Sequence, residues 1–217
     1  MLNAIAGAFQ VDSGTISIDG QDVTKLPEHK RAAFLGRVFQ DPMMGTAPTM
    51  QIEENLALAA RRGQPRGLKW GITALERADY RELLKTLDLG LEDRLTAKVG
   101  LLSGGQRQAL TLLMASLKQP KLLLLDEHTA ALDPKTADKV LALSDQIVQE
   151  NNLTTLMITH NMKDAIAHGN RLIMMDAGRV VVDISGEDKK KLTVPDLLAL
   201  FSRASGSDEA NDKMLLS

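Results

Sequence analysis

Two short segments constrain the fold of this chain more than anything else in it. The first, Leu102–Gln106, places a serine and two glycines where a helix would begin. The second, about twenty residues later, is a run of four leucines that ends in two adjacent carboxylates, Asp126 and Glu127. Four consecutive leucines indicate a buried strand, as in a parallel sheet covered by helices. The two segments therefore predict an α/β fold with its chemistry at the carboxyl end of that strand.

The remaining periodicity agrees with such a sheet, interrupted by a helical region from about Thr49 to Leu117. The elements expected in chain order are a helix over Leu2–Phe9, strands over Gly14–Gly20 and Leu35–Phe39, the helical region, a strand over Lys121–Asp126, a helix over Pro134–Glu150, and strands over Leu153–Thr159, Arg171–Met175 and Val180–Ile184. We predict an α/β core from 1–45 and 118–185, a helical subdomain over 46–117, and a C-terminal helix with a mobile tail over 186–217.

Charge, cysteine content and hydropathy exclude several classes of protein. The 217 residues carry a net charge of -2, which gives no reason to expect a nucleic-acid partner. There is no cysteine, so disulfides and thiolate metal sites are excluded. Apolar runs are far shorter than the roughly 20 residues that span a bilayer. We expect a soluble intracellular protein that reaches a membrane only through a partner.

The two carboxylates after the leucine strand suit metal-assisted chemistry. Asp126 can hold Mg²⁺, commonly through water, and Glu127 can orient or deprotonate an attacking water. The alternative is a core strand that merely ends in acids, which describes roughly half of such isolated patterns. The other motifs of this chain favour the first interpretation.

The serine–glycine segment suits the binding of a phosphate. Gly104 and Gly105 let a phosphate approach the backbone, and the amides at a helix start carry partial positive charge. Alternatively, Ser103 simply caps a helix after a glycine turn, which is a common arrangement. The complete run Leu102–Gln106 is much more specific than a glycine pair, and it favours the phosphate site.

Three further polar residues follow the predicted strands. His160 ends the strand after the crossover helix, so it and Asp126 are expected at one sheet edge, where His160 can face a γ-phosphate. Gln40 follows the strand over Leu35–Phe39 and can contact the metal or the water. Asp133 lies in the loop after the acids, where it can reach a second subunit or cap the next helix.

Together these motifs resemble those of the ATP-binding subunits of ABC transporters, over nearly all of the chain up to residue 185. The resemblance implies a P-loop NTPase core of the RecA-like type with a helical insertion. It also implies these roles: Asp126 as the Walker B aspartate, Glu127 as the catalytic glutamate, Gln40 as the Q-loop glutamine, Asp133 as the D-loop aspartate and His160 as the switch histidine. Magnesium would be held by Asp126 and Gln40.

The same resemblance implies ligands, partners and location. ATP and Mg²⁺ would bind at the interface of a head-to-tail dimer of identical or different ATPase subunits. There Ser103, Gly104, Gly105 and Gln106 would contact ATP held by the opposite subunit. The helical subdomain would dock on a transmembrane permease, with Gln40 at the junction, and a substrate-binding protein would supply the solute. The implied function is to power a bacterial importer of a small solute from the cytoplasmic face of the membrane.

The chain departs from the family pattern at two places. His128 stands where the family has proline, and we expect it to pack at the turn without a catalytic role. No loop of the form G-x-x-x-x-G-K-[ST], the Walker A motif, occurs in the sequence. That loop supplies backbone donors and a lysine for the phosphates and a hydroxyl for Mg²⁺. We expect that the chain is truncated at its N-terminus, and that these 217 residues alone neither bind ATP tightly nor hydrolyse it.

Two other functions are open from the sequence. One is a soluble ABC-type ATPase outside transport, although such proteins often carry tandem cassettes, long coiled-coil insertions or basic arms, which this chain lacks. The other is a non-catalytic binding module that has lost its loop. Retention of Glu127, Gln40, Ser103 and His160 argues against that second alternative.

Overall fold

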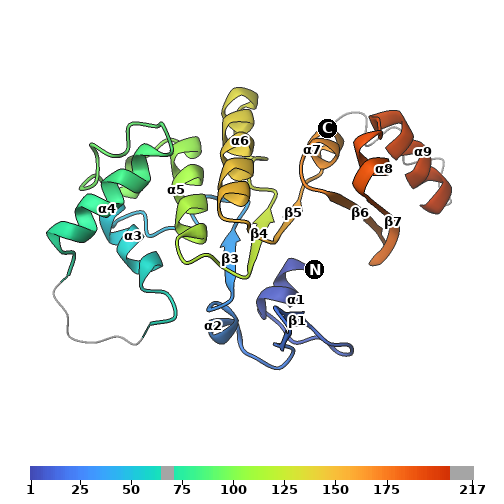
Figure 1. The fold of residues 1–217 in the computed structure, drawn as a ribbon, viewed down its shortest axis with the longest axis horizontal. Helices are drawn as coiled ribbons and strands as arrows, with labels where there is room; N and C mark the ends of the chain where they lie inside the picture. Colours follow the sequence, from blue (N-terminus) through green and yellow to red (C-terminus); the bar gives the residue numbers. More distant parts are fainter. Residues whose placement is uncertain (65–70, 206–217) are drawn as a thin grey trace. The chain divides into compact units, whose positions relative to one another are not determined.

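The computed structural model describes residues 1–64 and 71–205, which form two compact units (Figure 1). The first unit is Met1–Ile158 and the second begins at Thr159. Within the described part, no helix is both long enough and apolar enough to cross a membrane. The predicted mobile tail falls outside the described residues, and the predicted domain boundaries stay a prediction.

The first unit contains most of the regular structure. Its elements in chain order are α1 (Leu2–Ala6), β1 (Ser17–Ile18), β2 (Gln21–Asp22), α2 (Glu28–Arg31), β3 (Leu35–Val38), α3 (Ile52–Ala60), α4 (Ala74–Lys85), a 3₁₀ turn (Val99–Leu101), α5 (Gly104–Ser116), β4 (Leu122–Asp126), α6 (Pro134–Glu150) and β5 (Thr155–Ile158).

A parallel sheet with the order β3-β4-β5 lies at the centre of this unit (Figure 1). The leucine strand β4 is the middle strand, and Leu123, Leu124 and Leu125 are buried. In the register of the sheet, Val38 of β3 lies beside Leu125, and Asp126 lies beside Ile158 of β5. The parallel crossover predicted from the sequence is therefore confirmed, and the acid pair lies at the end of the central strand.

Alternate leucines of β4 enter two different hydrophobic layers, because successive side chains of a strand point to opposite faces. Leu123 and Leu125 pack with residues of α5 and α6, including Leu112 and Ile147. On the other face, Leu124 packs with residues of α1 and of the β1–β2 hairpin. Helices therefore cover one face of the sheet, while a short helix and the hairpin cover the other.

The helical part, α3 to α5, has a core of its own, in which Ile52, Leu56, Leu84 and Leu110 are fully buried. The predicted helical insertion is thus confirmed as a set of helices that pack on one another. An ion pair joins two of these helices. Glu53 of α3, whose side chain is 5% exposed, accepts two hydrogen bonds from the Arg77 guanidinium of α4, at 2.6 and 2.8 Å.

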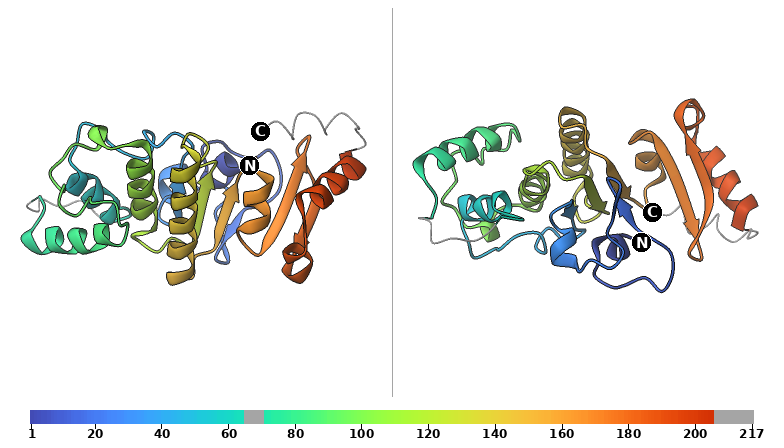
Figure 2. Two further views of the ribbon diagram at one scale, coloured as in Figure 1. Left: turned by 90° about the horizontal axis from the view of Figure 1, so that it is seen from above. Right: turned by 60° about the horizontal axis from the view of Figure 1, so that its bottom comes forward.

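The second unit is an antiparallel hairpin packed against short helices. Its elements are α7 (Met162–Ala167), β6 (Arg171–Asp176), β7 (Arg179–Ser185), α8 (Gly186–Lys190) and α9 (Val194–Ser205). Leu172 and Val182 of the hairpin pack with Leu197 of α9, and Figure 2 shows α9 lying along the hairpin. Lys189 is buried and donates hydrogen bonds to the carbonyls of Ile166 and His168.

Two predicted elements have different bounds in the structure, and one helix was not predicted. The first helix ends at Ala6 and not at Phe9, because Gly7 adopts a left-handed conformation with φ of 84° and closes the helix. The β1–β2 hairpin is present as predicted, but its first strand is only Ser17–Ile18. Helix α7 was not predicted, since its six residues are too few for a clear helical period.

Candidate functional site

Each carboxylate at the end of β4 is contacted by a residue of β3 or of the turn that follows β3. The Asp126 Oδ2 atom lies 3.1 Å from Nη2 of Arg37, which is an ion pair. The Glu127 Oε2 atom accepts a hydrogen bond of 3.0 Å from Nε2 of Gln40. The structure therefore places Gln40 and Arg37 at the acid pair, while the predicted contact of Gln40 with a metal ion or a water stays a prediction.

Glu127 has a strained backbone. Its φ is 44°, in the left-handed region that residues with a Cβ atom rarely adopt. The strand ladder holds it there, because the Glu127 amide donates to the Ile158 carbonyl at 3.0 Å, and the Glu127 carbonyl accepts from the Ala130 amide at 3.0 Å. Backbone strain of this kind is concentrated at functional sites.

His128 packs at the turn after the acids, as predicted. Its side chain is buried, and its Nε2 atom lies 2.9 Å from Oγ of Ser144 in α6. Ser144 in turn donates to the Val140 carbonyl at 2.8 Å. His128 therefore fixes the turn that carries Glu127 against helix α6.

Arg37 is a site residue that the sequence analysis missed. Besides Asp126, its Nη2 atom contacts Oδ1 of Asn3 at 2.6 Å, and its guanidinium lies over the ring of Phe39, 4.4 Å from the centroid. Its side chain is only 15% exposed. The available signal was a charged residue inside the otherwise apolar strand β3, because a cation in such a position requires an anionic or polar partner.

The glycine loop is a capped helix start. The Ser103 hydroxyl accepts from the Gln106 amide, and the Gln106 side chain accepts from the Ser103 amide, both at 3.2 Å. This is a capping box. Gly105 is buried, and a Cβ atom there would collide with Cγ2 of Thr136 in α6. The cap is thus present, and Gly105 is required by packing; neither finding tests the predicted contact with ATP.

Helix α5 also supports the turn before Gln40. Gln108 is fully buried, and its Nε2 atom donates to the Phe39 carbonyl at 3.1 Å. This contact was not predicted, because a glutamine next to a polar loop in the sequence gives no sign of complete burial. It joins the helix that begins with Ser103 to the residue directly before Gln40.

Asp133 caps α6, as one of the two sequence interpretations proposed. Its carboxylate accepts from the Thr136 amide at 3.1 Å. The hydrogen bonds from Thr136 lower the pKa of Asp133 below its ordinary value. Because Gly105 packs against this same Thr136, the glycine loop and the Asp133 loop are neighbours.

His160 lies two residues after β5, is exposed, and belongs to the second unit. The acid pair belongs to the first unit, so the approach of His160 to a phosphate at these acids stays a prediction.

The donor set at the acids fits a magnesium ion that arrives with phosphate groups. Among residues 1–64 and 71–205, no three His, Cys, Asp or Glu side chains gather into a metal cage. Mg²⁺, however, is commonly held by one or two carboxylates together with phosphate oxygens and water. The carboxylate of Asp126 and the amide oxygen of Gln40 are oxygen ligands of the required kind.

Comparisons with known proteins agree with this geometry. A family model described as ABC transporter matches residues 1–130. The tyrosine transport ATP-binding protein of Clostridioides difficile is 48% identical over 204 residues, which are 94% of this chain and 81% of that protein. The methionine import ATP-binding protein of Rhizobium etli is 37% identical over 185 residues, 83% of this chain and 48% of that protein.

A solved structure agrees as well. An ATP-binding cassette described as a dimer in a post-hydrolysis state, bound to ADP and Pi, matches with a TM-score of 0.69 and 29% identity, over 85% of this chain and 78% of that one. With the parallel sheet, the helical part and the acid pair in place, the chain belongs to the ABC transporter family of ATP-binding cassettes.

Proposed function

We propose that this chain is the ATPase subunit that powers a bacterial importer of a small solute. The observation that carries the proposal is the acid pair, presented at the end of the central strand and contacted by Gln40. The similarity to ATP-binding proteins for tyrosine transport and methionine import supports the importer class. Those names also make an amino acid or a similar small solute the substrate class to test first.

In this proposal the residues of the site have separate roles. Asp126 and Gln40 hold the magnesium ion of Mg–ATP, which supplies neutralisation of phosphate charge when it is bound. Glu127 orients the attacking water and takes its proton. Its left-handed backbone supports this role, because strained backbone is concentrated at functional sites. His160 contacts the γ-phosphate from the end of β5.

The glycine loop acts on a second subunit. In a head-to-tail dimer, Ser103 and the amides of Gly104, Gly105 and Gln106 contact the ATP that the partner subunit holds. The capped helix start supports this role, since its amides carry partial positive charge toward an approaching phosphate. Asp133, in the neighbouring loop, lies at the same interface. The partner subunit is either a second copy of this chain or a related one.

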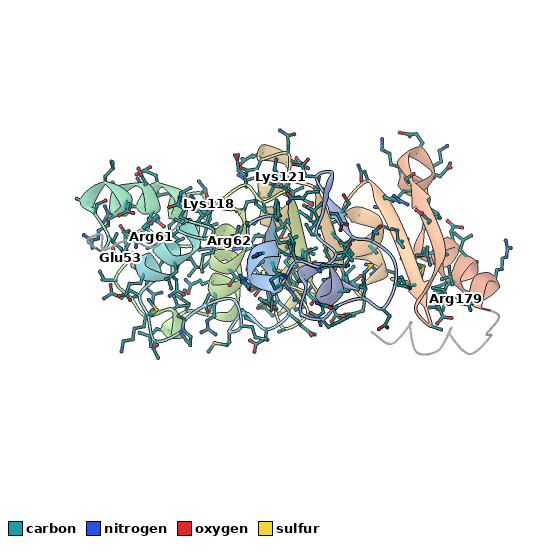
Figure 3. The ribbon with its side chains drawn as sticks, turned by 90° about the horizontal axis from the view of Figure 1, so that it is seen from below. Glu53, Arg61, Arg62, Lys118, Lys121 and Arg179 are labelled. Carbon is teal, nitrogen blue, oxygen red and sulfur yellow. The ribbon has the colours of Figure 1, made fainter. Side chains whose placement is uncertain are left out.

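The helical part offers a groove for the permease. It has a volume of about 320 Å³ between α3 and α4. Glu53 and Arg61, labelled in Figure 3, line it together with apolar side chains that include Met50, Leu58 and Ile72. A groove lined by both apolar and charged side chains suits a short amphipathic helix of a membrane protein. Docking there would hold the subunit on the cytoplasmic face of the membrane, beneath a permease served by a substrate-binding protein.

The 217 residues alone are proposed to be inactive, because no Walker A loop occurs among them. Each charge-assisted hydrogen bond to a phosphate contributes about 1.5–3 kcal/mol, so the absence of several costs many decades of affinity. Equilibrium binding of a fluorescent ATP analogue to the purified chain should be undetectable at micromolar concentrations. A clear ATPase rate from this polypeptide would contradict the proposed inactivity of the 217 residues alone.

The function is tested in the transporter purified from its own membranes. Glu127→Gln should lower the ATPase rate at least about a hundredfold and trap dimers with ATP bound, because the general base is removed. Glu82→Gln, at an exposed acid of α4, is the matched control and should keep the parent rate. Hydrolysis by Glu127→Gln at the parent rate would show that Glu127 is not the base. If no permease purifies together with the protein, an ABC-type ATPase outside transport would be favoured.

A further inference from the structure

Arg37 forms an ion pair with Asp126, whose carboxylate is proposed to hold magnesium. Its guanidinium lies 3.1 Å from Asp126 Oδ2, so a positive charge already neutralises the acid in the structure. A metal ion bound by Asp126 would lie close to this guanidinium, which already uses one of the two carboxylate oxygens. Like charges at this separation also repel each other, and the repulsion is stronger in a partly buried site than in water.

The contact between Arg37 and Asp126 is built so that it can be released. It consists of one Nη2–Oδ2 approach, without the paired fork of hydrogen bonds that an arginine can make with a carboxylate. Asp126 remains 32% exposed, so it can be reached from solvent. Separating the two charges therefore costs less free energy here than in a fully buried ion pair, because water can reach the carboxylate.

Arg37 also has contacts that hold it when Asp126 takes another partner. Its Nη2 atom is 2.6 Å from the Asn3 side chain in α1, and its guanidinium lies over the Phe39 ring. Both contacts are with uncharged groups, and neither depends on Asp126. The guanidinium can therefore stay beside the site after the carboxylate has turned to a metal ion.

We propose that Arg37 keeps bare divalent cations off Asp126, so that the acid accepts a cation only together with phosphate groups. The negative charge of a nucleotide offsets the repulsion by Arg37, whereas a hydrated ion alone has nothing to offset it. Arg37 is thus a residue that determines specificity through Asp126. The inference rests on the proposed role of Asp126 in holding magnesium.

The test measures binding of Mn²⁺ alone to the 217-residue chain, from the electron paramagnetic resonance signal of the unbound ion. Arg37→Gln should bind Mn²⁺ about tenfold more tightly than the parent, since the competing charge is gone. Arg37→Lys keeps the charge and should stay within about twofold of the parent. Arg179→Gln, an exposed arginine of the second unit labelled in Figure 3, makes the same change in net charge and should also leave the affinity unchanged.

Asp126→Asn, added to Arg37→Gln, should cancel the gain in affinity. If Arg37→Gln binds Mn²⁺ no more tightly than the parent, while Asp126→Asn weakens the binding of the parent, the role of Arg37 is overturned and that of Asp126 stands. If the gain survives Asp126→Asn, or if neither the parent nor Arg37→Gln binds Mn²⁺, the proposed role of Arg37 toward bare cations is overturned. Circular dichroism spectra of all variants establish that a change in affinity is not a loss of fold.

Discussion

The acid pair and the glycine loop are both short motifs in the sequence, yet the structure forms them by different means. The loop is shaped mainly by neighbours, since Ser103 and Gln106 cap each other across three residues. The acids depend on partners 89 and 87 residues away, Arg37 for Asp126 and Gln40 for Glu127. The loop is therefore a property of its own segment, whereas the acid site exists only once the sheet has formed.

Two glycines of the loop that look equivalent in the sequence differ in the packing around them. A Cβ atom at Gly105 would collide with the stiff, β-branched Thr136, while one at Gly104 would meet only the flexible end of Leu132, at 3.3 Å. Gly105→Ala should therefore lower the free energy of unfolding by about 2 kcal/mol through overpacking. Gly104→Ala should change it by less than about 0.5 kcal/mol. Urea unfolding followed by circular dichroism measures both.

Equal effects of the two alanines would break the distinction. In that case α5 and α6 would adjust to the added Cβ atom, and packing would not be the reason for glycine at position 105. Contact with a ligand would be the remaining reason. The double variant Gly105→Ala with Thr136→Ser removes the colliding methyl group and should recover most of the lost stability. Such recovery would locate the strain at this one contact.

A corresponding test for the acid pair concerns the strained backbone of Glu127. Glu127→Gly and Glu127→Ala both remove the carboxylate and its hydrogen bond with Gln40. Only glycine adopts a φ of 44° without a steric cost. The glycine variant should therefore be more stable than the alanine variant by about 1 kcal/mol. Equal free energies of unfolding would mean that the turn relaxes when the side chain is lost, so that its shape comes from the carboxylate and not from the sheet.

The sequence predicted the elements well where the signals are local. Helix α6 begins and ends at the predicted residues, Pro134 and Glu150, because an aspartate cap and a proline mark its start. Strand β4 follows from its leucines. The end of α1 was missed, although Gly7 is a typical left-handed cap, because the apolar pattern continues to Phe9.

Contacts across the sheet could not be predicted in the same way. The proximity of Arg37 to Asp126 depends on the register of β3 against β4, and a slip of one residue would turn Arg37 to the other face. The burial of His128 was predicted, but its partner Ser144 depends on how α6 packs. The sequence thus predicts which residues carry the chemistry, which stays a prediction, and the packing decides which contacts hold them in place.

The local character of the loop can be tested at its cap. Ser103→Ala removes the hydroxyl that accepts from the Gln106 amide and should lower the free energy of unfolding by on the order of 0.5 kcal/mol, because the bond is exposed and long. Ser103→Asn offers another acceptor and should retain the parent stability. Thermal unfolding of both variants measures the difference. A loss that is equally large in Ser103→Asn would mean that the loop depends on more than its cap.

The two helix starts at the proposed dimer interface should also differ in their response to acid. Thr136 lowers the pKa of Asp133, so the folded chain binds a proton there less readily than the unfolded chain does. By linkage, the stability from this cap is fully present above the ordinary aspartate pKa of about 3.9, and it is lost as the pH falls through the lowered folded value.

Ser103 does not titrate in this range, so its cap should be indifferent to the same change. The parent and Asp133→Asn, which caps without titrating, should therefore have the same melting temperature at pH 6. The parent should fall slightly below Asp133→Asn near pH 3, where the aspartate begins to take up its proton. Ser103→Ala should lie below the parent by a constant margin at both pH values. If the melting temperatures of the parent and Asp133→Asn change equally with pH, the Thr136 hydrogen bonds survive protonation of Asp133. The two caps would then differ in their position and not in their charge.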